Sequence, residues 1–201
     1  MKVKKICQGM MMANCYIVYD ENNNGFIVDP VDEGGEIENY IDTNKINIEF
    51  ILLTHTHFDH VMGLDYFKNR YNVKVYASED SKNIANDLDY NLSSGYCTLD
   101  IKIDRYLRDN EEFSNFKIKA MKTPGHSLDS MSYKVGNDIF SGDTLFNLSI
   151  GRSDFPGGDY NTLINSIKNE LLVYDDQTKI HPGHGPSSSI GFERKNNPFL
   201  N

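Results

Sequence analysis

The chain has 201 residues and a formal net charge of −9 at pH 7, with 29 acidic and 20 basic side chains. This length suits one well-buried core and is short for two, so we expect a single domain over residues 1–201. The acidic balance and the lack of a Lys/Arg cluster argue against a nucleic-acid partner, and no apolar run is long enough for a signal peptide or a membrane span. The three cysteines form no CxxC pair and leave an odd thiol, which favours packing roles in a reducing compartment and a cytoplasmic protein.

In the first half of the chain, apolar runs typical of strands alternate with patterns typical of helices. The expected strands cover residues 2–7, 14–19, 26–29, 50–53 and 73–77. Apolar side chains at helical spacing predict helices over residues 35–44 and 61–71. The run 50–53 is apolar without interruption, so we expect this strand to be covered on both faces.

The second half repeats this pattern. The expected strands cover residues 116–121, 131–135, 138–141 and 178–180, and a helix is expected over residues 160–173. A Gly136-Asn137 turn joins the second and third of these strands as a hairpin. Because hairpins and helical connections both occur, we predict an α/β fold with mixed sheets and helices outside them.

The histidines are concentrated in three short segments, and each segment follows an apolar run. The segment His55–His60 reads HTHFDH, and the other two histidine segments are Thr123–His126 (TPGH) and His181–His184 (HPGH). A lone aspartate, Asp143, follows the run Ile139–Phe140 in the same way. Groups that follow the carboxyl ends of strands in α/β sheets converge on one crevice, so these segments are expected to meet.

Imidazoles with a few carboxylates form the kind of donor set that zinc prefers in open sites. In an extended segment, residues two apart point the same way, so His55 and His57 would grip one ion together. Asp59 and His60 follow a turn and would face a second position nearby. The alternative for His181 is an ordinary hydrogen-bonded histidine, which its sequence context favours, and Asp143 taken alone is equally consistent with a turn residue.

These segments together resemble the metallo-β-lactamase-fold hydrolases, and most closely the short glyoxalase II-like (hydroxyacylglutathione hydrolase-like) branch. The resemblance extends from about residue 3 to residue 190 and rests on six motifs, and Asn14-Cys15-Tyr16 also resembles the second strand of the family. The motifs are THTHFDH (54–60), TPGH (123–126), GDTLF (142–146), SIGRSD (149–154), PGG (156–158) and PGHGP (182–186). The resemblance implies a four-layer αββα sandwich of two mixed β-sheets flanked by helices.

The resemblance also implies two metal ions, zinc by default with iron or manganese as alternatives. The first would be bound by His55, His57 and His126, and the second by Asp59, His60 and His184. Asp143 would bridge the two ions, and Asp59 and Asp143 are the carboxylates expected in the catalytic machinery. Thr54 and Ser141 are expected to hydrogen-bond to the metal ligands.

The function implied is hydrolysis of a small-molecule thioester or related activated ester by water that the metal pair activates. Arg152 is a candidate for holding a substrate anion, with a structural arginine as its alternative, and Phe146 and Tyr160 are candidates for the substrate pocket. The long glyoxalase II carries glutathione-binding residues on a C-terminal domain that this sequence lacks, and its Gly-His-Glu segment is Gly183-His184-Gly185 here. Glutathione specificity is therefore not implied.

Other functions stay open on the same scaffold. A persulfide dioxygenase would use one iron, held by His55, His126 and Asp143, although the PGG motif at 156–158 favours the hydrolase branch. A lactonase or a phosphodiesterase would use the same pair of metals. An inactive binding module is disfavoured because no ligand is missing, and a flavodiiron protein is disfavoured because it has Glu where His57 stands.

Overall fold

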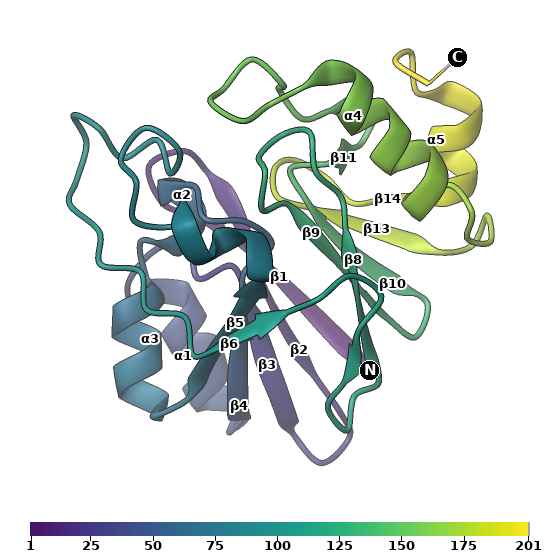
Figure 1. Cartoon of the computed structure of the whole chain (residues 1–201). Coiled ribbons are helices and arrows are strands. Elements are labelled where there is room, and N and C mark those ends of the chain that lie inside the picture. Colours follow the sequence, from purple (N-terminus) through teal and green to yellow (C-terminus); the bar gives the residue numbers. More distant parts are fainter. Residues whose placement is uncertain (201) are drawn as a thin grey trace.

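Two β-sheets pack face to face in the computed structural model, which describes residues 1–200, and helices cover their outer faces (Figure 1). The first sheet has the order β1-β2-β3-β4-β5-β6, in strands Lys2–Gln8, Ala13–Tyr19, Asn24–Val28, Asn47–Leu52, Lys74–Ser78 and Arg105–Leu107. The second has the order β14-β13-β10-β9-β8-β7, in strands Ser188–Ser189, Lys179–Pro182, Asp138–Gly142, Met131–Val135, Ile118–Lys122 and Glu112–Phe113. The predicted αββα sandwich of mixed sheets is confirmed.

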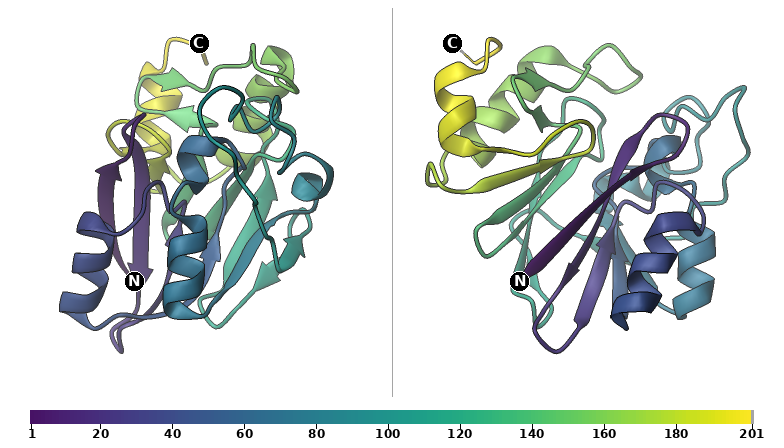
Figure 2. Two further views of the ribbon diagram at one scale, coloured as in Figure 1. Left: turned by 90° about the vertical axis from the view of Figure 1, so that its left-hand side faces the viewer. Right: turned by 180° about the vertical axis from the view of Figure 1, so that it is seen from behind.

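Helices flank each sheet on the side away from the other sheet (Figure 2). The helices of the first half are α1 (Gly35–Asn44), α2 (Phe58–Val61) and α3 (Leu64–Tyr71), followed by the 3₁₀ turn η1 (Glu79–Asn83). Those of the second half are α4 (Tyr160–Ser166), which continues into the π-helical turn η2 (Ile167–Leu171), and α5 (Ile190–Asn196). A small ribbon of β11 (Leu145–Phe146) and β12 (Ser149–Ile150) lies between β10 and α4.

Three apolar layers hold this stack together, because both faces of each sheet are buried. Along β2, Tyr16 and Val18 pack between the sheets, whereas Cys15 and Ile17 alternate onto the face that α1 and α3 cover. A third layer joins the second sheet to α4, η2 and α5. The alternation is the period-two geometry of a strand, and it explains why these strands read as continuously apolar.

Strand direction places the histidine segments at one end of the sandwich. Strands β3 to β6 run parallel, so β4 delivers the HTHFDH segment at the same edge as its neighbours end. In the second sheet β10 is parallel to β13, and β8 runs in the same direction because both β8 and β10 are antiparallel to β9. The carboxyl ends of β8, β10 and β13 therefore share an edge, as the sequence predicted.

Several predicted elements differ from the structure. The single helix expected over residues 61–71 is two helices, separated where the Gly63 backbone packs against the chain and its N–H donates to the Pro30 carbonyl (2.8 Å). The helix expected over residues 160–173 ends at Leu171, after its π-helical turn. The elements η1, β6, β7, β11, β12, β14 and α5 were not predicted, because neither a continuous apolar run nor apolar side chains at helical spacing mark them in the sequence.

The three cysteines are all free, and they differ in environment. Cys15 is fully buried in the apolar layer under α1, as expected of a packing residue. Cys97 is half-buried, whereas Cys7 is exposed, so the packing role expected of Cys7 was wrong. Within residues 1–200 there is no helix with the length and hydropathy needed to cross a bilayer.

Candidate active site

Seven side chains from four strand ends meet at the edge of the sandwich. The loop after β4 delivers four of them, and the ends of β8, β10 and β13 deliver one each. They fall into three overlapping groups whose candidate ligand atoms lie within 4.8 Å of one another. These groups are His55–His57–His126, His55–His60–Asp143 and Asp59–His60–His184.

Asp143 occupies the centre of this cluster. Its Oδ1 lies 3.5 Å from His60 Nε2, and its Oδ2 lies 3.5 Å from His126 Nε2 and 3.6 Å from His184 Nε2. Its two oxygens therefore face imidazoles of both implied metal positions. Asp59 Oδ2 lies 3.3 Å from His184 Nε2, which places that carboxylate on the side of His60 and His184.

Hydrogen bonds behind the cluster fix which imidazole nitrogen faces its centre. Thr54 Oγ1 donates its proton to Asp29 Oδ2 (2.6 Å), so it accepts from His55 Nδ1 (3.1 Å). His60 Nδ1 donates to the same Asp29 oxygen (2.9 Å), and His126 Nδ1 donates to the Arg152 carbonyl (2.8 Å). Each of these rings consequently points Nε2 at the centre, which leaves that nitrogen to bind a metal.

Several buried polar atoms at the centre have no protein partner. They are His55 Nε2, His57 Nε2, His60 Nε2 and Asp143 Oδ1. Buried polar atoms are almost always hydrogen-bonded, so four of them at one point require an explanation. In addition, His57 Nδ1 and His126 Nε2 lie 2.9 Å apart. Nitrogen and oxygen donors arranged in this way fit divalent cations, so the residues present are suited to the metals that the family resemblance implies.

The pKa values of the side chains in the cluster are shifted in different directions. Burial lowers the pKa of His57 to about 3, and burial together with the neighbouring imidazoles lowers the pKa of His55, so both rings are neutral at pH 7. Burial opposes the ionised form of Asp143, but His60 outweighs it and the pKa of Asp143 lies below its usual range. Burial opposes the charged forms of His60 and His184, but Asp59 and Asp143 outweigh it and raise the pKa of both imidazoles above the usual range. A cation bound among these groups would therefore displace protons from His60 and His184, whereas His55 and His57 are already neutral donors.

Asp29 is the most important residue that the sequence analysis missed. It is 1% exposed, sits just past β3 with φ 53°, and accepts from the backbone N–H of Thr54 (2.8 Å) as well as from Thr54 Oγ1 and His60. A non-glycine residue in this strained region is held there by its surroundings. The available signal was an aspartate between an apolar strand and Pro30, at a strand end like those of the histidine segments.

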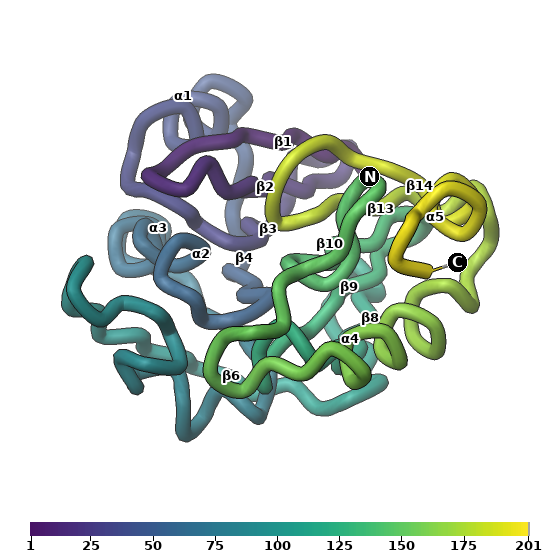
Figure 3. Tube along the Cα trace, turned by 90° about the horizontal axis from the view of Figure 1, so that it is seen from above, coloured from purple at the N-terminus to yellow at the C-terminus, as the bar shows by residue number. Residues whose placement is uncertain are grey.

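The loop that carries His184 is held by β2, a strand of the opposite sheet. Asn14 Nδ2 donates to the carbonyls of Pro182 (2.8 Å) and Gly185 (3.0 Å), and the buried Tyr16 hydroxyl donates to Pro182 as well (2.6 Å). Figure 3 shows this yellow-green loop beside the purple strands of the first sheet. The second half of the chain thus places its last candidate ligand by bonding to the first half.

Close backbone packing allows the strand ends to approach the cluster. A Cβ on Gly183 would overlap Asp143 Oδ1 and lie 2.7 Å from His60 Cε1. A Cβ on Gly142, whose φ is 50°, would lie 2.5 Å from Thr54 Oγ1. These two positions accept only glycine without rearrangement of the candidate ligands or of their partners.

A cleft of about 840 Å³ opens above the cluster. His57, Asp59, His126, Asp143 and His184 form its floor. Its sides come from the loop between β1 and β2, the segment between η1 and β6, and the loops around residues 146 and 152–157. A buried cluster of this kind at the bottom of a concave cleft is the usual arrangement of a catalytic site.

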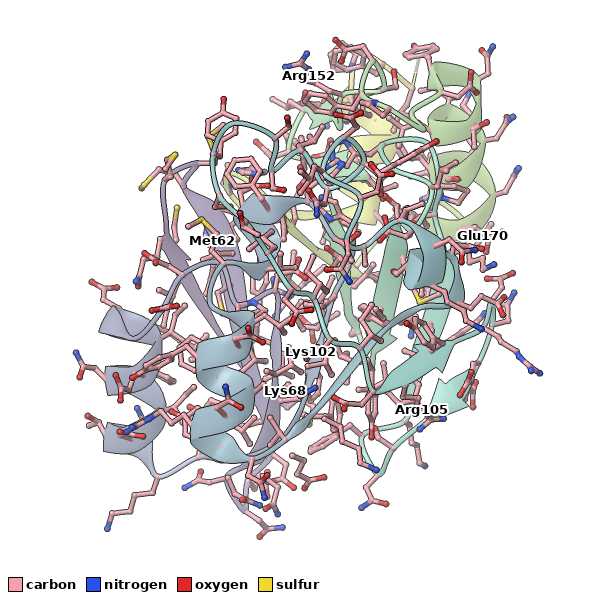
Figure 4. The ribbon with its side chains drawn as sticks, turned by 60° about the vertical axis from the view of Figure 1, so that its left-hand side comes forward. Met62, Lys68, Lys102, Arg105, Arg152 and Glu170 are labelled. Atoms are coloured by element: carbon pink, nitrogen blue, oxygen red, sulfur yellow. The ribbon has the colours of Figure 1, made fainter. Side chains whose placement is uncertain are left out.

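The three candidate substrate residues lie in different places. Phe146 lines the cleft, with its ring centroid 6.2 Å from that of His184. The Arg152 side chain reaches the rim and pairs with Asp154 through Nε and Nη2 (2.9 and 2.7 Å), and Figure 4 shows it at the outer end of the loops. Tyr160 is 50% exposed at the start of α4 and does not line the cleft, so its expected pocket role is not supported.

His181, Thr54 and Ser141 lie around the cluster without being candidate ligands. His181 Nε2 donates to Asp138 Oδ1 (2.8 Å), and its ring stacks on Phe140 away from the metal-ligand groups, as the hydrogen-bonded alternative predicted. Thr54 contacts His55 as expected. Ser141 instead donates to the Leu145 carbonyl (2.9 Å), so its hydroxyl supports the backbone around Asp143 and does not orient a candidate ligand as expected.

The chain is similar to curated proteins over its full length. The chain is 35% identical to "Probable metallo-hydrolase YqgX" of Bacillus subtilis over 100% of this chain and 98% of that protein. It is 34% identical to "Hydroxyacylglutathione hydrolase GloC" of Haemophilus influenzae, over 100% of this chain and 99% of that protein. The chain therefore spans almost the full length of both relatives.

The fold is also similar to those of solved structures. The BLEG-1 B3 metallo-beta-lactamase superposes with a TM-score of 0.95 at 33% identity, over 100% of both chains. TTHA1623, solved in a di-iron-bound form, superposes with a TM-score of 0.88 at 30% identity, over 98% of this chain and 100% of that one. The model of the Metallo-beta-lactamase superfamily matches residues 9–184, which include all seven candidate ligands. The chain therefore belongs to the metallo-beta-lactamase superfamily.

Proposed function

We propose that this protein is a dinuclear metal-dependent hydrolase that acts on a thioester or a related activated ester. The observation that carries the proposal is the set of unpartnered nitrogen and oxygen atoms of His55, His57, His60 and Asp143 at the floor of an open cleft. The similarity to a hydroxyacylglutathione hydrolase supports a thioester as the substrate. Zinc suits the donor set, and iron is also compatible, since a relative was solved with two irons.

A pair of bound metal ions supplies an activated water and positive charge that stabilises an oxyanion. His55, His57 and His126 would hold one ion, whereas Asp59, His60 and His184 would hold the other. Asp143 faces both sets and would keep the two positions together.

The remaining residues of the site orient these ligands. Asp29 and the Arg152 carbonyl keep three imidazoles in the tautomer that points Nε2 inward. The open cleft lets an acyl carbon approach the floor. Metal affinity and substrate access are therefore supplied by different sets of residues.

Metal quantification combined with a substrate panel tests this proposal. We expect about two metal ions per chain, bound tightly enough to survive gel filtration, and hydrolysis of thioesters that stops after chelation and returns on addition of Zn²⁺. The panel contains a hydroxyacyl thioester of glutathione, a neutral N-acetylcysteamine thioester, an aliphatic lactone, bis-p-nitrophenyl phosphate and glutathione persulfide. One iron per chain with oxygen consumption on the persulfide would overturn the proposal in favour of a dioxygenase.

A further inference from the structure

The walls of the cleft contrast with its polar floor because they are mostly apolar. The apolar and aromatic side chains that line them include Phe58, Leu88, Tyr90, Tyr96, Phe146 and Phe155. Leu88 is 48% exposed and Tyr96 is 65% exposed, so this apolar surface faces solvent in the absence of a ligand. An exposed apolar patch inside a concave site marks a surface that a ligand covers.

The wall formed by the segment between η1 and β6 is anchored to the site. The backbone N–H of Phe58, the residue before Asp59, donates to the Asn91 carbonyl (2.8 Å). The Asn91 side chain is fully buried and donates to the Ala85 carbonyl (2.9 Å). The Tyr96 ring stacks on the Phe58 ring at 5.0 Å between centroids and 11° between planes. These contacts hold Leu88 and Tyr96 beside the metal-ligand loop.

The opposite wall approaches the first one closely. Gly157 has φ 81°, and a Cβ there would lie 3.2 Å from Tyr90 Cε1. Phe155 lies edge-on to both His57 and His126, with ring centroids 5.7 and 5.8 Å away. The path from the cluster to the rim is therefore bounded by aromatic rings on two sides, which suits an apolar substituent next to the reacting carbonyl.

The charges around the cleft do not suit an anionic substrate. Among residues 1–200, Arg152 is the one Lys or Arg side chain that lines the cleft, and Asp154 already neutralises it through two hydrogen bonds. Asp89 adds a carboxylate to the wall. Glutathione carries two carboxylates and coenzyme A carries phosphates, and such groups are recognised by clusters of Arg and Lys.

From this charge distribution and these walls, we infer that the cleft selects thioesters or esters in which the acyl group and the leaving group are both uncharged. An aliphatic or aromatic acyl chain of several carbons would lie along Leu88 and Tyr96. Hydrolysis breaks the C–S or C–O bond and forms a C–O bond to the water oxygen. One proton of the water passes to the departing thiolate or alkoxide, and the other is released from the carboxylic acid that forms. The inference rests on the proposed hydrolase function and adds the substrate class.

Matched thioesters test the substrate class on the metal-loaded protein. We compare acetyl and hexanoyl thioesters of N-acetylcysteamine with the hexanoyl thioester of glutathione. We expect kcat/KM to rise at least about tenfold from acetyl to hexanoyl, as burial of part of four methylenes predicts. We also expect the neutral hexanoyl thioester to exceed its glutathione counterpart. Equal values along the acyl series, or preference for the glutathione thioester, would overturn the inference.

Two leucine variants test whether the wall between η1 and β6 causes the preference for a longer acyl chain. Leu88→Asn is expected to reduce the hexanoyl-to-acetyl ratio of kcat/KM by about threefold or more. Leu148→Asn is the matched control, because Leu148 is 43% exposed and lies outside the cleft, and its ratio is expected to equal that of the unaltered protein. Equal ratios in the two variants would exclude Leu88 from the acyl site and contradict the inference.

Calorimetry separates failure of the inference from failure of the proposed function. S-hexyl-N-acetylcysteamine, a thioether that water cannot cleave, is expected to bind at least about tenfold more tightly than S-hexylglutathione. Tight binding of the neutral thioether without hydrolysis of any ester would reject the proposed function and support the apolar selectivity of the cleft. Hydrolysis of thioesters combined with tighter binding of S-hexylglutathione than of the neutral thioether would support the proposed function and reject the inference.

Discussion

The two sheets contribute to the candidate site in different ways. The first sheet supplies four adjacent side chains from the loop after β4, and the buried carboxylate of Asp29 orients His60 directly and His55 through Thr54. The second sheet supplies His126, Asp143 and His184 from separate strand ends, where backbone carbonyls and glycines do the positioning. The first half should therefore be sensitive to changes in polar side chains, and the second half to added atoms near the backbone.

The largest effect is expected at Asp143, the residue that faces both sets of imidazoles. Asp143→Ala should reduce metal content and lower hydrolysis by more than about 100-fold, because even partners of metal ligands contribute 10–100-fold. Metal analysis and kcat/KM on a thioester measure this. Asp65→Ala, which removes an exposed carboxylate from α3, is the control. Normal turnover in Asp143→Ala would show that Asp143 does not hold the metals.

A glycine substitution tests the backbone positioning in the second half. Gly183→Ala should displace Asp143 or His60 and reduce the free energy of unfolding by about 1–3 kcal/mol, with loss of metal affinity. Gly185→Ala is the matched control, since its φ is 73° but no atom lies within 4 Å of the added Cβ. Urea unfolding and metal titration compare the two. If both variants bind metal equally, close packing at Gly183 does not control the site.

Asp29→Asn tests the side-chain positioning in the first half. The amide keeps the size of the carboxylate but cannot accept from both Thr54 and His60 through a charged oxygen, so metal affinity should decrease about 10–100-fold. Excess metal should restore activity. Asp129→Asn is the control, because Asp129 is an equally buried carboxylate that accepts from Thr56, Ser81 and Ser127 and from no histidine. Equal losses of metal affinity in both variants would contradict the assignment.

The smallest effect is expected at Arg152. Arg152→Ala removes a solvent-screened ion pair with Asp154 and leaves in place the carbonyl that orients His126. Metal affinity should change by less than about threefold, as measured by competition with a chromophoric chelator. A tenfold loss of kcat/KM restricted to anionic thioesters would instead show that the guanidinium binds substrate.

The sequence predicted the residues of the site better than the arrangement that supports them. The HTHFDH segment, His126, Asp143 and His184 were recognisable because each follows an apolar run at a turn, and the structure brings them together. The roles of the Asp29 and Asn14 side chains were not recognised, because a single buried Asp or Asn has no spacing pattern and its role depends on partners 25 to 171 residues away. Tyr160 was a candidate for the pocket, but it lies exposed at the start of α4.

The secondary structure, too, was predicted well only where it does not depend on contacts with distant parts of the chain. Segments with a clear apolar pattern, such as α1 and β9, were predicted at their observed bounds. The helix expected over residues 61–71 was interrupted at Gly63 by a contact with Pro30, and such a tertiary contact leaves no periodic signal. The segment between η1 and β6, which forms a wall of the cleft, has no repeating pattern and gave no prediction.

The bonds from Asn14 and Tyr16 to the His184 loop have a thermodynamic consequence. They cross between the two sheets, so His184 reaches its place only after both halves of the chain have docked. Ions shared by ligands from both halves would then bind the assembled chain and not the separated parts. Each added order of magnitude in free metal concentration should consequently raise the melting temperature of the whole sandwich, as a removable cross-link would.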